Sequence, residues 1–175
     1  AKVIVHAPTR TEAALRLARV LQTTRVQGLT TNRDFLVSVL RHEAFLAGDT
    51  TTDFIERIDP PRNRKATREE MIEAAIAAAM VAQSVRRMNT KALRNIASGW
   101  RNSVMPPEFL EFNIGDEELT LQYQSQRDGS FLAMADDLKW PVFVRFWQGQ
   151  EISLEIDGRL QQCTVVADGN RWITH

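Results

Sequence analysis

A nearly unbroken run of apolar positions predicts a long helix over residues 67–88. Between Met71 and Val85 only three positions are polar, and alanine, the best helix former, supplies much of the remainder. Thr67 and Glu70 have the spacing of a capping box at the start, and two arginines near the end suit the negative pole of the helix dipole. A surface helix would carry a broad polar face. We therefore predict a helix of about five turns with protein on most sides.

After residue 108 apolar and polar positions alternate, which predicts strands. Three clear runs contain Leu119, Leu121 and Tyr123; Val142, Val144 and Phe146, interleaved with Phe143, Arg145 and Trp147; and Ile152, Leu154 and Ile156. Asp-Gly pairs at 128–129, 157–158 and 168–169 separate such runs and favour hairpin turns, because both residues tolerate positive φ. We predict an antiparallel meander of roughly seven strands over 109–175, the last one unfinished, curled into a barrel that the apolar helix fills.

The first 58 residues predict a smaller α/β layer in the order strand, helix, strand, helix. The β-branched run 2–6 and the short run 25–28 are typical of strands. Thr11 is predicted to cap the first helix, and Thr31 with Asp34 the second, whose buried stripe extends to Phe45 before Gly48 closes the unit. Residues 59–66 are rich in proline and charge and predict a linker, so a domain boundary is expected there.

Residues 98–108 form a predicted loop with unusually large hydrophobic side chains, and we call them the hook segment. Trp100 and Met105 lie in a stretch that ends with two prolines, and Arg101 follows the tryptophan directly. Trp100 could simply cover one end of the core. The alternative is a protein-docking loop, because Trp, Met and Arg are enriched at interfaces.

Charge and chemical motifs exclude several classes of function. The formal net charge is zero, which gives no basic surface for nucleic acid or for an anionic membrane, and the apolar helix is too short to span a bilayer. There is no phosphate-binding glycine loop, no paired cysteine and no nucleophilic serine motif, and the three histidines lie far apart. The lone Cys163 lies in a strand-like run and is expected to be buried. The sequence therefore predicts no complete active site.

The first 58 residues strongly resemble the end of the biotin carboxylase domain. The resemblance rests on two ordered patterns, V-x-G-x-x-T-N followed after two residues by F-L at 26–36, and F-x-x-G-x-x-T-T-x-F-I at 45–55. It implies that the ATP site, the magnesium or manganese ligands and the biotin-facing groups lie upstream. Of the family's functional positions, only one falls within this stretch, and it is occupied by Thr52. In the family that position helps to form the wall of the adenine pocket. The start at Ala1 without an initiator Met also suggests a piece of a longer polypeptide.

Residues 67–175 are similar to the domain that follows biotin carboxylase in acyl-CoA carboxylase α subunits of the propionyl- and methylcrotonyl-CoA type, known as the BT domain. The similarity rests on residues 99–102, Gly-Trp-Arg-Asn, and on topology. It implies an α+β fold in which a long helix at 67–88 is enclosed by an antiparallel barrel of about eight strands at 109–175, with the last strand truncated. It also implies that the hook segment, through Trp100, Arg101, Asn102 and Met105, grips the carboxyltransferase β subunit.

The resemblance predicts part of a biotin-dependent ligase of fatty acid metabolism in a hetero-oligomer. Its cofactors would be biotin, ATP and Mg²⁺ or Mn²⁺, and its partners the β subunit and the biotinyl carrier domain of the same chain; no lysine here has the Ala-Met-Lys-Met setting of a biotin acceptor. The expected location is the cytoplasm of a bacterium, which is favoured over the mitochondrial matrix. The alternative is a ligand-binding barrel without catalysis, which would have a cavity only if the helix lay outside it, with residues 74–82 exposed to solvent. A weaker option is a self-associating scaffold that uses the hook segment and Trp147.

Overall fold

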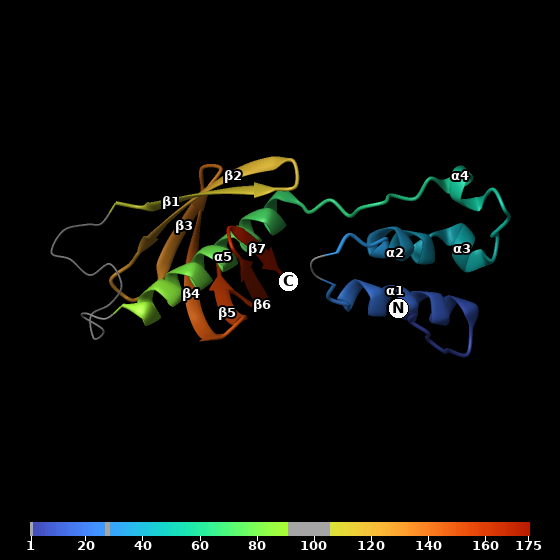
Figure 1. The fold of residues 1–175 in the computed structure, drawn as a ribbon, viewed down its shortest axis with the longest axis horizontal. Coiled ribbons are helices and arrows are strands. Elements are labelled where there is room, and N and C mark those ends of the chain that lie inside the picture. Colours follow the sequence, from blue (N-terminus) through green and yellow to red (C-terminus); the bar gives the residue numbers. More distant parts are fainter. Residues whose placement is uncertain (1, 27–28, 91–105) are drawn as a thin grey trace. The chain divides into compact units, whose positions relative to one another are not determined.

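The structure is a computed structural model that describes residues 2–26, 29–90 and 106–175. Its chain divides into two compact units, residues 1–65 and 66–175. Each unit is described by itself (Figure 1).

The described residues of the first unit form four helices, three of which share a small apolar core. The helices are α1 (Arg10–Thr23), α2 (Arg33–Arg41), α3 (Glu43–Ala47) and α4 (Phe54–Ile58). Ala14 and Ala18 of α1 are buried against Leu40 of α2, so small side chains on one helix allow the two helices to approach closely. Gly48 ends α3 with φ +86°, a left-handed conformation that suits glycine and confirms the predicted end of this helical stretch.

The strands predicted in the first unit are wrong for the residues that the structure describes. Residues 2–6 form no strand, and Ile4 is 80% exposed. Arg25 and Val26 form no strand either, while residues 27–28 lie outside the described part of the chain. A β-branched run becomes a strand only where another strand accepts its backbone hydrogen bonds, and the described residues of this unit supply none.

The helix boundaries in the first unit also differ from the prediction. Thr9, not Thr11, is the N-cap of α1, and its side chain accepts a hydrogen bond from the Glu12 backbone N–H. Asn32, not Thr31, precedes α2 and makes no side-chain cap. The expected continuous second helix is broken at His42, whose extended backbone starts α3 and whose Nδ1 accepts from the Ala44 N–H at 3.2 Å. A capping side chain thus competes successfully with continuation of the helix.

The second unit is organised around the predicted long helix, α5 (Arg68–Asn89). Thr67 is its N-cap, and both hydrogen bonds of the capping box with Glu70 are present, which confirms the predicted start. Every residue from Ala75 to Val81 is buried, so consecutive positions around the whole circumference of the helix lie against protein. The helix is therefore enclosed over its middle turns, as its apolar pattern predicts.

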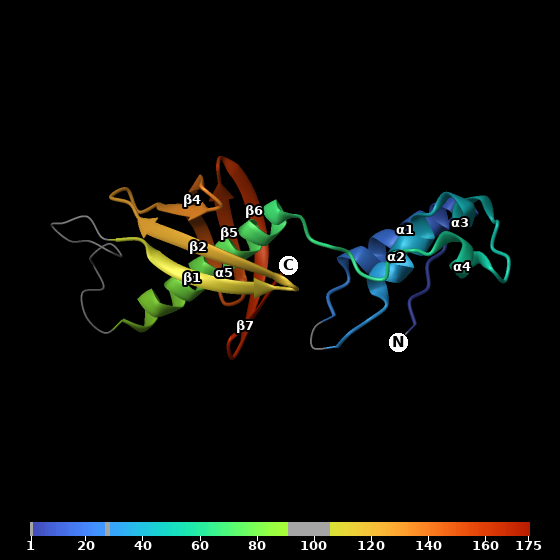
Figure 2. The same ribbon diagram turned by 90° about the horizontal axis from the view of Figure 1, so that it is seen from above.

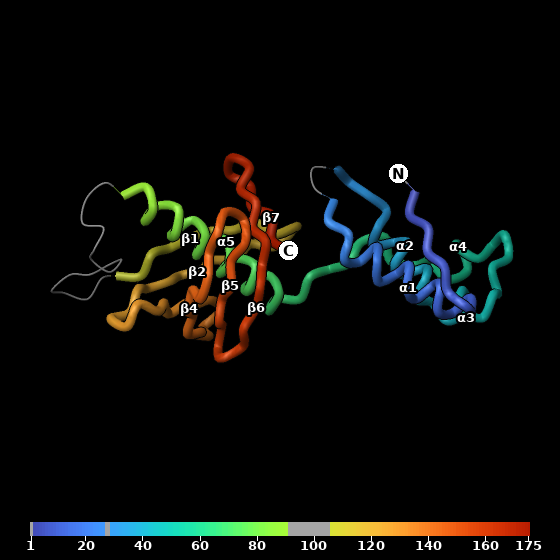
Figure 3. The backbone as a smooth tube through the Cα atoms, turned by 90° about the horizontal axis from the view of Figure 1, so that it is seen from below, coloured from blue at the N-terminus to red at the C-terminus, as the bar shows by residue number. Residues whose placement is uncertain are grey.

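Seven antiparallel strands form one sheet in sequence order around α5 (Figures 1 and 2). They are β1 (Glu108–Ile114), β2 (Glu117–Ser125), β3 (Phe131–Ala135), β4 (Leu138–Gln148), β5 (Glu151–Ile156), β6 (Arg159–Asp168) and β7 (Arg171–Thr174). Helix α5 contacts β1 and β2 as well as β4, β5, β6 and β7, so the sheet curls around it, as the backbone trace also shows (Figure 3). The mixed α+β class and the curled sheet are confirmed.

Closure of the sheet into a barrel is not observed in residues 106–175. Strands β1 and β7 are the two ends of the strand order and are not paired with one another. The concave face holds α5 itself, and Ile76, Ala77 and Met80 have no exposed surface. The space beside residues 74–82 that a ligand-binding barrel requires is thus occupied by the sheet's own core.

Tight turns join neighbouring strands, in part as the sequence predicts. Asp157 and Gly158 both have positive φ, as a type I′ hairpin requires. The β3–β4 turn uses Asp136 and Asp137 in the same way, at φ +48° and +64°. The pair at 168–169 is wrong by one position, because Asp168 still belongs to β6 and the turn begins at Gly169.

A β-bulge interrupts the alternation predicted for β4. Val144 pairs with Leu154 and Trp147 pairs with Ile152, and the register shifts between Val144 and Phe146. Phe146 is therefore 51% exposed, whereas Trp147 packs on the core. One extra residue in a strand reverses the faces of the residues after it, which the sequence alternation alone does not reveal.

The enclosure of α5 makes a specific prediction for two methionines of the same helix. Met80 has no exposed surface and Met88 is 63% exposed. Met80→Ala should lower the free energy of unfolding by about 2–5 kcal/mol, because it leaves a cavity. Met88→Ala, the matched control, should change it by less than about 0.5 kcal/mol. Denaturant unfolding followed by tryptophan fluorescence measures both, since all four tryptophans lie in the second unit. Equal effects would contradict the enclosure.

Candidate functional site

The structure describes only one of the site residues that the sequence suggests. Trp100, Arg101, Asn102 and Met105 lie outside the described residues. Thr52 is described, and it is exposed in the turn that precedes α4. Its role in an adenine pocket therefore stays a prediction, as does the role of the hook segment.

A cluster of three polar side chains joins the two chain ends between which residues 91–105 lie. Arg86 belongs to the last turn of α5, Glu108 is the first residue of β1, and Tyr123 lies opposite Glu108 on β2. The Tyr123 hydroxyl donates to Glu108 Oε2 at 2.6 Å. Arg86 Nη2 donates to the same carboxylate oxygen at 2.9 Å and also contacts the Tyr123 hydroxyl. Each side chain of this clamp thus interacts with the other two.

Local sequence explains how the clamp forms. Tyr123 occupies an inner-face position of β2, where its ring is buried and packs edge-on against Phe131 at 6.1 Å between centroids. A buried phenol requires a hydrogen-bond partner for its hydroxyl. The antiparallel register brings Glu108 to the same face of the neighbouring strand, and the arginine in the last helical turn supplies the opposite charge.

The electrostatics of the clamp keep its phenol protonated. Burial and the Glu108 carboxylate raise the pKa of Tyr123 above its usual value, while the nearby Arg86 guanidinium opposes part of that rise. Tyr123 therefore remains a neutral donor at physiological pH. It serves as a hydrogen-bonded junction in the clamp, and its raised pKa disfavours the phenolate that a base or nucleophile would need.

The other end of α5 is held by separate ion pairs. Arg68 Nε and Nη2 donate to the two carboxylate oxygens of Asp136 at 2.6 and 2.8 Å. Arg159 Nη2 donates to Glu69 at 2.7 Å and to Glu73 at 2.8 Å. Charged side chains therefore tie both ends of the apolar helix to strands or turns of the surrounding sheet.

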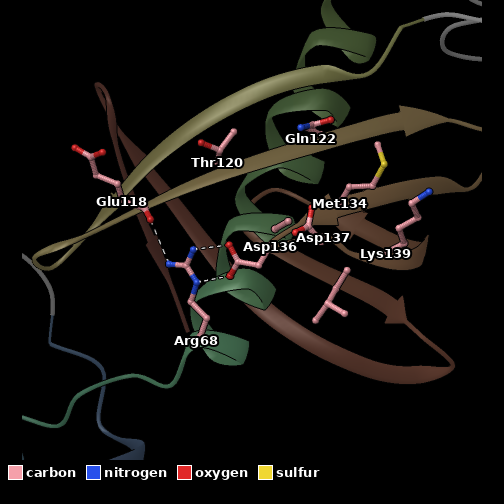
Figure 4. A pocket seen from close by; sticks show the side chains of 10 residues that line it. Arg68, Glu118, Thr120, Gln122, Met134, Asp136, Asp137 and Lys139 are labelled. Atoms are coloured by element: carbon pink, nitrogen blue, oxygen red, sulfur yellow. Dashed lines mark hydrogen bonds and ion pairs between the residues drawn. The ribbon is translucent and has the colours of Figure 1, made fainter.

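A hollow of about 580 Å³ lies beside the first of these ion pairs (Figure 4). Its lining includes Arg68, Thr120, Gln122, Met134 and Lys139. The guanidinium that faces it is already bonded to the Asp136 carboxylate and to the Glu118 carbonyl at 3.2 Å. The polar groups of the hollow thus serve the attachment of α5, and they make no constellation of nucleophile, base and oxyanion donors.

The remaining candidate groups give no catalytic centre within the described residues. Cys163 is half-buried rather than fully buried, and burial together with Glu73 raises the pKa of its thiol, so it is a poor nucleophile. No group of three His, Cys, Asp or Glu side chains is placed to hold a metal ion in the described ranges. Trp147, named above as a possible contact for self-association, packs on the core and donates to the Gly149 carbonyl at 3.0 Å. None of the helices described there is long and apolar enough to cross a bilayer.

The clamp predicts how the chain's single tyrosine titrates. Glu108→Gln should lower the pKa of Tyr123 and Arg86→Ala should raise it, because each removes one of two opposing influences. Ultraviolet absorbance of tyrosinate during an alkaline titration measures both shifts. A raised pKa in the folded state also means that Tyr123 contributes stability below pH about 10 that is lost as the pH rises further. Shifts in the same direction for both variants would contradict the clamp.

Comparisons with known proteins agree with the division into two units. Residues 1–57 match the model of the biotin carboxylase C-terminal domain family, and residues 71–175 match that of the methylcrotonyl-CoA carboxylase alpha-subunit BT domain family. The second match covers more than half of the chain.

Individual relatives give the same picture. The chain is 44% identical over 57 residues to biotin carboxylase 2 of Bacillus subtilis, which is 33% of this chain and 13% of the relative. It is 39% identical over 69 residues to the mitochondrial pyruvate carboxylase of Mus musculus, or 36% and 6% of the two chains. It is 26% identical over 140 residues to the mitochondrial methylcrotonoyl-CoA carboxylase subunit alpha of Rattus norvegicus, or 75% and 20%.

The chain therefore spans a fifth or less of these relatives. The family match rests on the unit that contains α5 and its curled sheet, and it follows a stretch similar to the end of a biotin carboxylase. The chain belongs to the methylcrotonyl-CoA carboxylase alpha-subunit BT domain family.

Proposed function

We propose that this chain is the part of a biotin-dependent acyl-CoA carboxylase α subunit that docks the carboxyltransferase β subunit. Residues 1–58 would complete the biotin carboxylase domain, 59–66 would be the linker, and 67–175 would be the docking domain. Within that domain the hook segment, residues 98–108, would contact the partner through Trp100, Arg101, Asn102 and Met105. The family match over residues 71–175 supports this division.

The observation that carries the proposal is the attachment of α5 at both ends. A docking loop binds its partner more tightly when the elements on either side of it are already fixed. A loop between mobile elements loses more conformational entropy on binding. Here the helix before residues 91–105 is enclosed by the sheet, and the strand after them is bonded to its last turn through the clamp. This support is mechanical and needs no active site in the fragment.

The proposed chemistry belongs to other parts of the complex. Biotin on a carrier domain, ATP and Mg²⁺ or Mn²⁺ would act at sites upstream or downstream of this chain, to which Thr52 alone would contribute, as part of the wall of the adenine pocket. The docking domain would fix the distance that the biotin arm travels, since a tethered carrier works only where its linker reaches both sites. A bacterial cytoplasm is the proposed location.

We also infer that the curled sheet is the larger part of a barrel of about eight strands. Strands β1 and β7, at opposite ends of the strand order, both contact α5. The two open edges are thus held by one helix, which favours closure by one further strand.

The proposal predicts that changes in the hook segment weaken assembly. Trp100→Ala or Arg101→Ala in the whole α subunit should weaken binding of the β subunit about 10- to 100-fold, as is usual for aromatic and arginine anchors. ATP-dependent carboxylation of free biotin should stay intact, because it needs no β subunit. Co-purification and the affinity for the β subunit measure the first effect, and bicarbonate incorporation into biotin measures the second.

Phe146→Ala and Arg145→Ala are the matched controls. They remove an exposed aromatic residue and an exposed arginine from β4, with Phe146 51% exposed. Both should leave assembly unchanged. Normal assembly of the α and β subunits in the Trp100 and Arg101 variants would contradict the proposal.

A further inference from the structure

The last turn of α5 and the first residue of β1 lie on either side of residues 91–105. A polar cluster that the sequence pattern does not reveal joins them. Arg86 lies four residues before Thr90, the last described residue of this stretch, and Glu108 lies two residues after Pro106, where the description resumes. Their side chains meet at one carboxylate oxygen, together with the Tyr123 hydroxyl. The clamp therefore joins the last turn of the helix before residues 91–105 to the first residue of the strand after them.

The clamp has an unusual combination of exposure and burial. The side chains of Arg86 and Glu108 are 52% and 54% exposed, and an exposed ion pair of this kind contributes little to stability. Tyr123, in contrast, is only 1% exposed. Its ring is fixed in the core, so it gives the two charged side chains a rigid hydrogen-bonding point that a surface ion pair lacks. The main effect of the clamp is thus on geometry.

A comparable cluster at the opposite end of α5 lacks this connection. Arg159 also bonds two carboxylates, those of Glu69 and Glu73, and its side chain is 64% exposed. It joins β6 to the first turns of α5 and bounds no segment of the predicted partner-binding loop. The two clusters are therefore similar in chemistry and differ in what they position.

We propose that Arg86, Tyr123 and Glu108 are positioning residues that hold the last turn of α5 and the start of β1 together, and thereby support the binding of the β subunit by the hook segment between them. This inference rests on the proposed function of that segment. Fixing both ends lowers the conformational entropy that the connection loses on binding, since the entropy cost of ordering a loop is reduced when its ends are already in place. The clamp thereby acts on affinity for the partner through the two elements that it holds together.

The test compares variants of the whole α subunit for binding to the purified β subunit. Tyr123→Phe, Glu108→Gln and Arg86→Ala should each weaken binding about tenfold. Arg159→Ala, the matched control, should change binding less than about twofold. Arg86→Lys should restore part of the affinity, because it keeps the charge. Equal losses in all four disruptive variants, or normal binding in the three clamp variants, overturns the inference.

Two further measurements separate positioning from a general loss of structure. The double variant Arg86→Ala with Glu108→Gln should have about the same affinity for the β subunit as whichever of the two single variants binds it less tightly. Either change alone already opens the clamp. The melting temperatures of the Arg86→Ala and Arg159→Ala variants should fall by similar amounts. Additive losses in the double variant, or losses of affinity that simply follow the melting temperature, contradict a positioning role.

Trp100→Ala measured in the same assay distinguishes this inference from the function on which it rests. Weak binding by Trp100→Ala with normal binding by the clamp variants overturns the inference alone. Normal binding by Trp100→Ala overturns the docking function of the hook segment. If the clamp variants still bind weakly in that case, the inference also fails, because the clamp then contacts the partner directly.

Discussion

Burial of α5 within the curled sheet is the constraint on which the second unit depends. From Ala75 to Val81 no turn of the helix has an exposed side, so it cannot leave the sheet without exposing its whole circumference to water. The inner faces of the strands are apolar for the same reason, with Leu121 and Leu154 fully buried. Helix and sheet therefore form one core, and neither is expected to persist without the other.

Apolar burial alone does not determine how the helix lies along the sheet. Ile76 and Met80 are large and fully buried, but the alanines around them offer few distinctive contacts. Charged residues add contacts with a fixed direction. Arg68 binds the β3–β4 turn near one end, Arg159 binds Glu69 and Glu73 on a different side, and Arg86 joins β1 and β2 at the other end. Orientation is thus specified by polar contacts at the periphery of an apolar core.

The sequence was informative where the pattern depends on local chemistry. The apolar run and the Thr67–Glu70 pair predicted α5, and the alternation of apolar and polar residues predicted most strands of the sheet. It was misleading where the outcome depends on a partner element: residues 2–6 have the composition of a strand but no strand beside them in the described part of the unit. The bulge in β4 and the cap at His42 depend on local alternatives of similar energy, and residue propensities do not show which alternative forms.

The same distinction applies to the candidate site. Trp100 and Arg101 stand out in a sequence because they are unusual in a loop. The clamp could not be found in this way, because Glu108 and Tyr123 become neighbours only through the strand register, and Arg86 resembles an ordinary arginine at a helix end. A tyrosine at an inner-face position, which must find a partner for its hydroxyl, was the available signal.

The alanines of α5 have a further consequence for the shape of the sheet. Because their side chains end at Cβ, they take up little space between the helix and the strands, and Ala75, Ala77 and Ala79 are all buried there. Substitution by wider residues along that helix would force the strands outward and flatten the sheet. The width of the helix therefore helps to set how tightly the sheet curls around it.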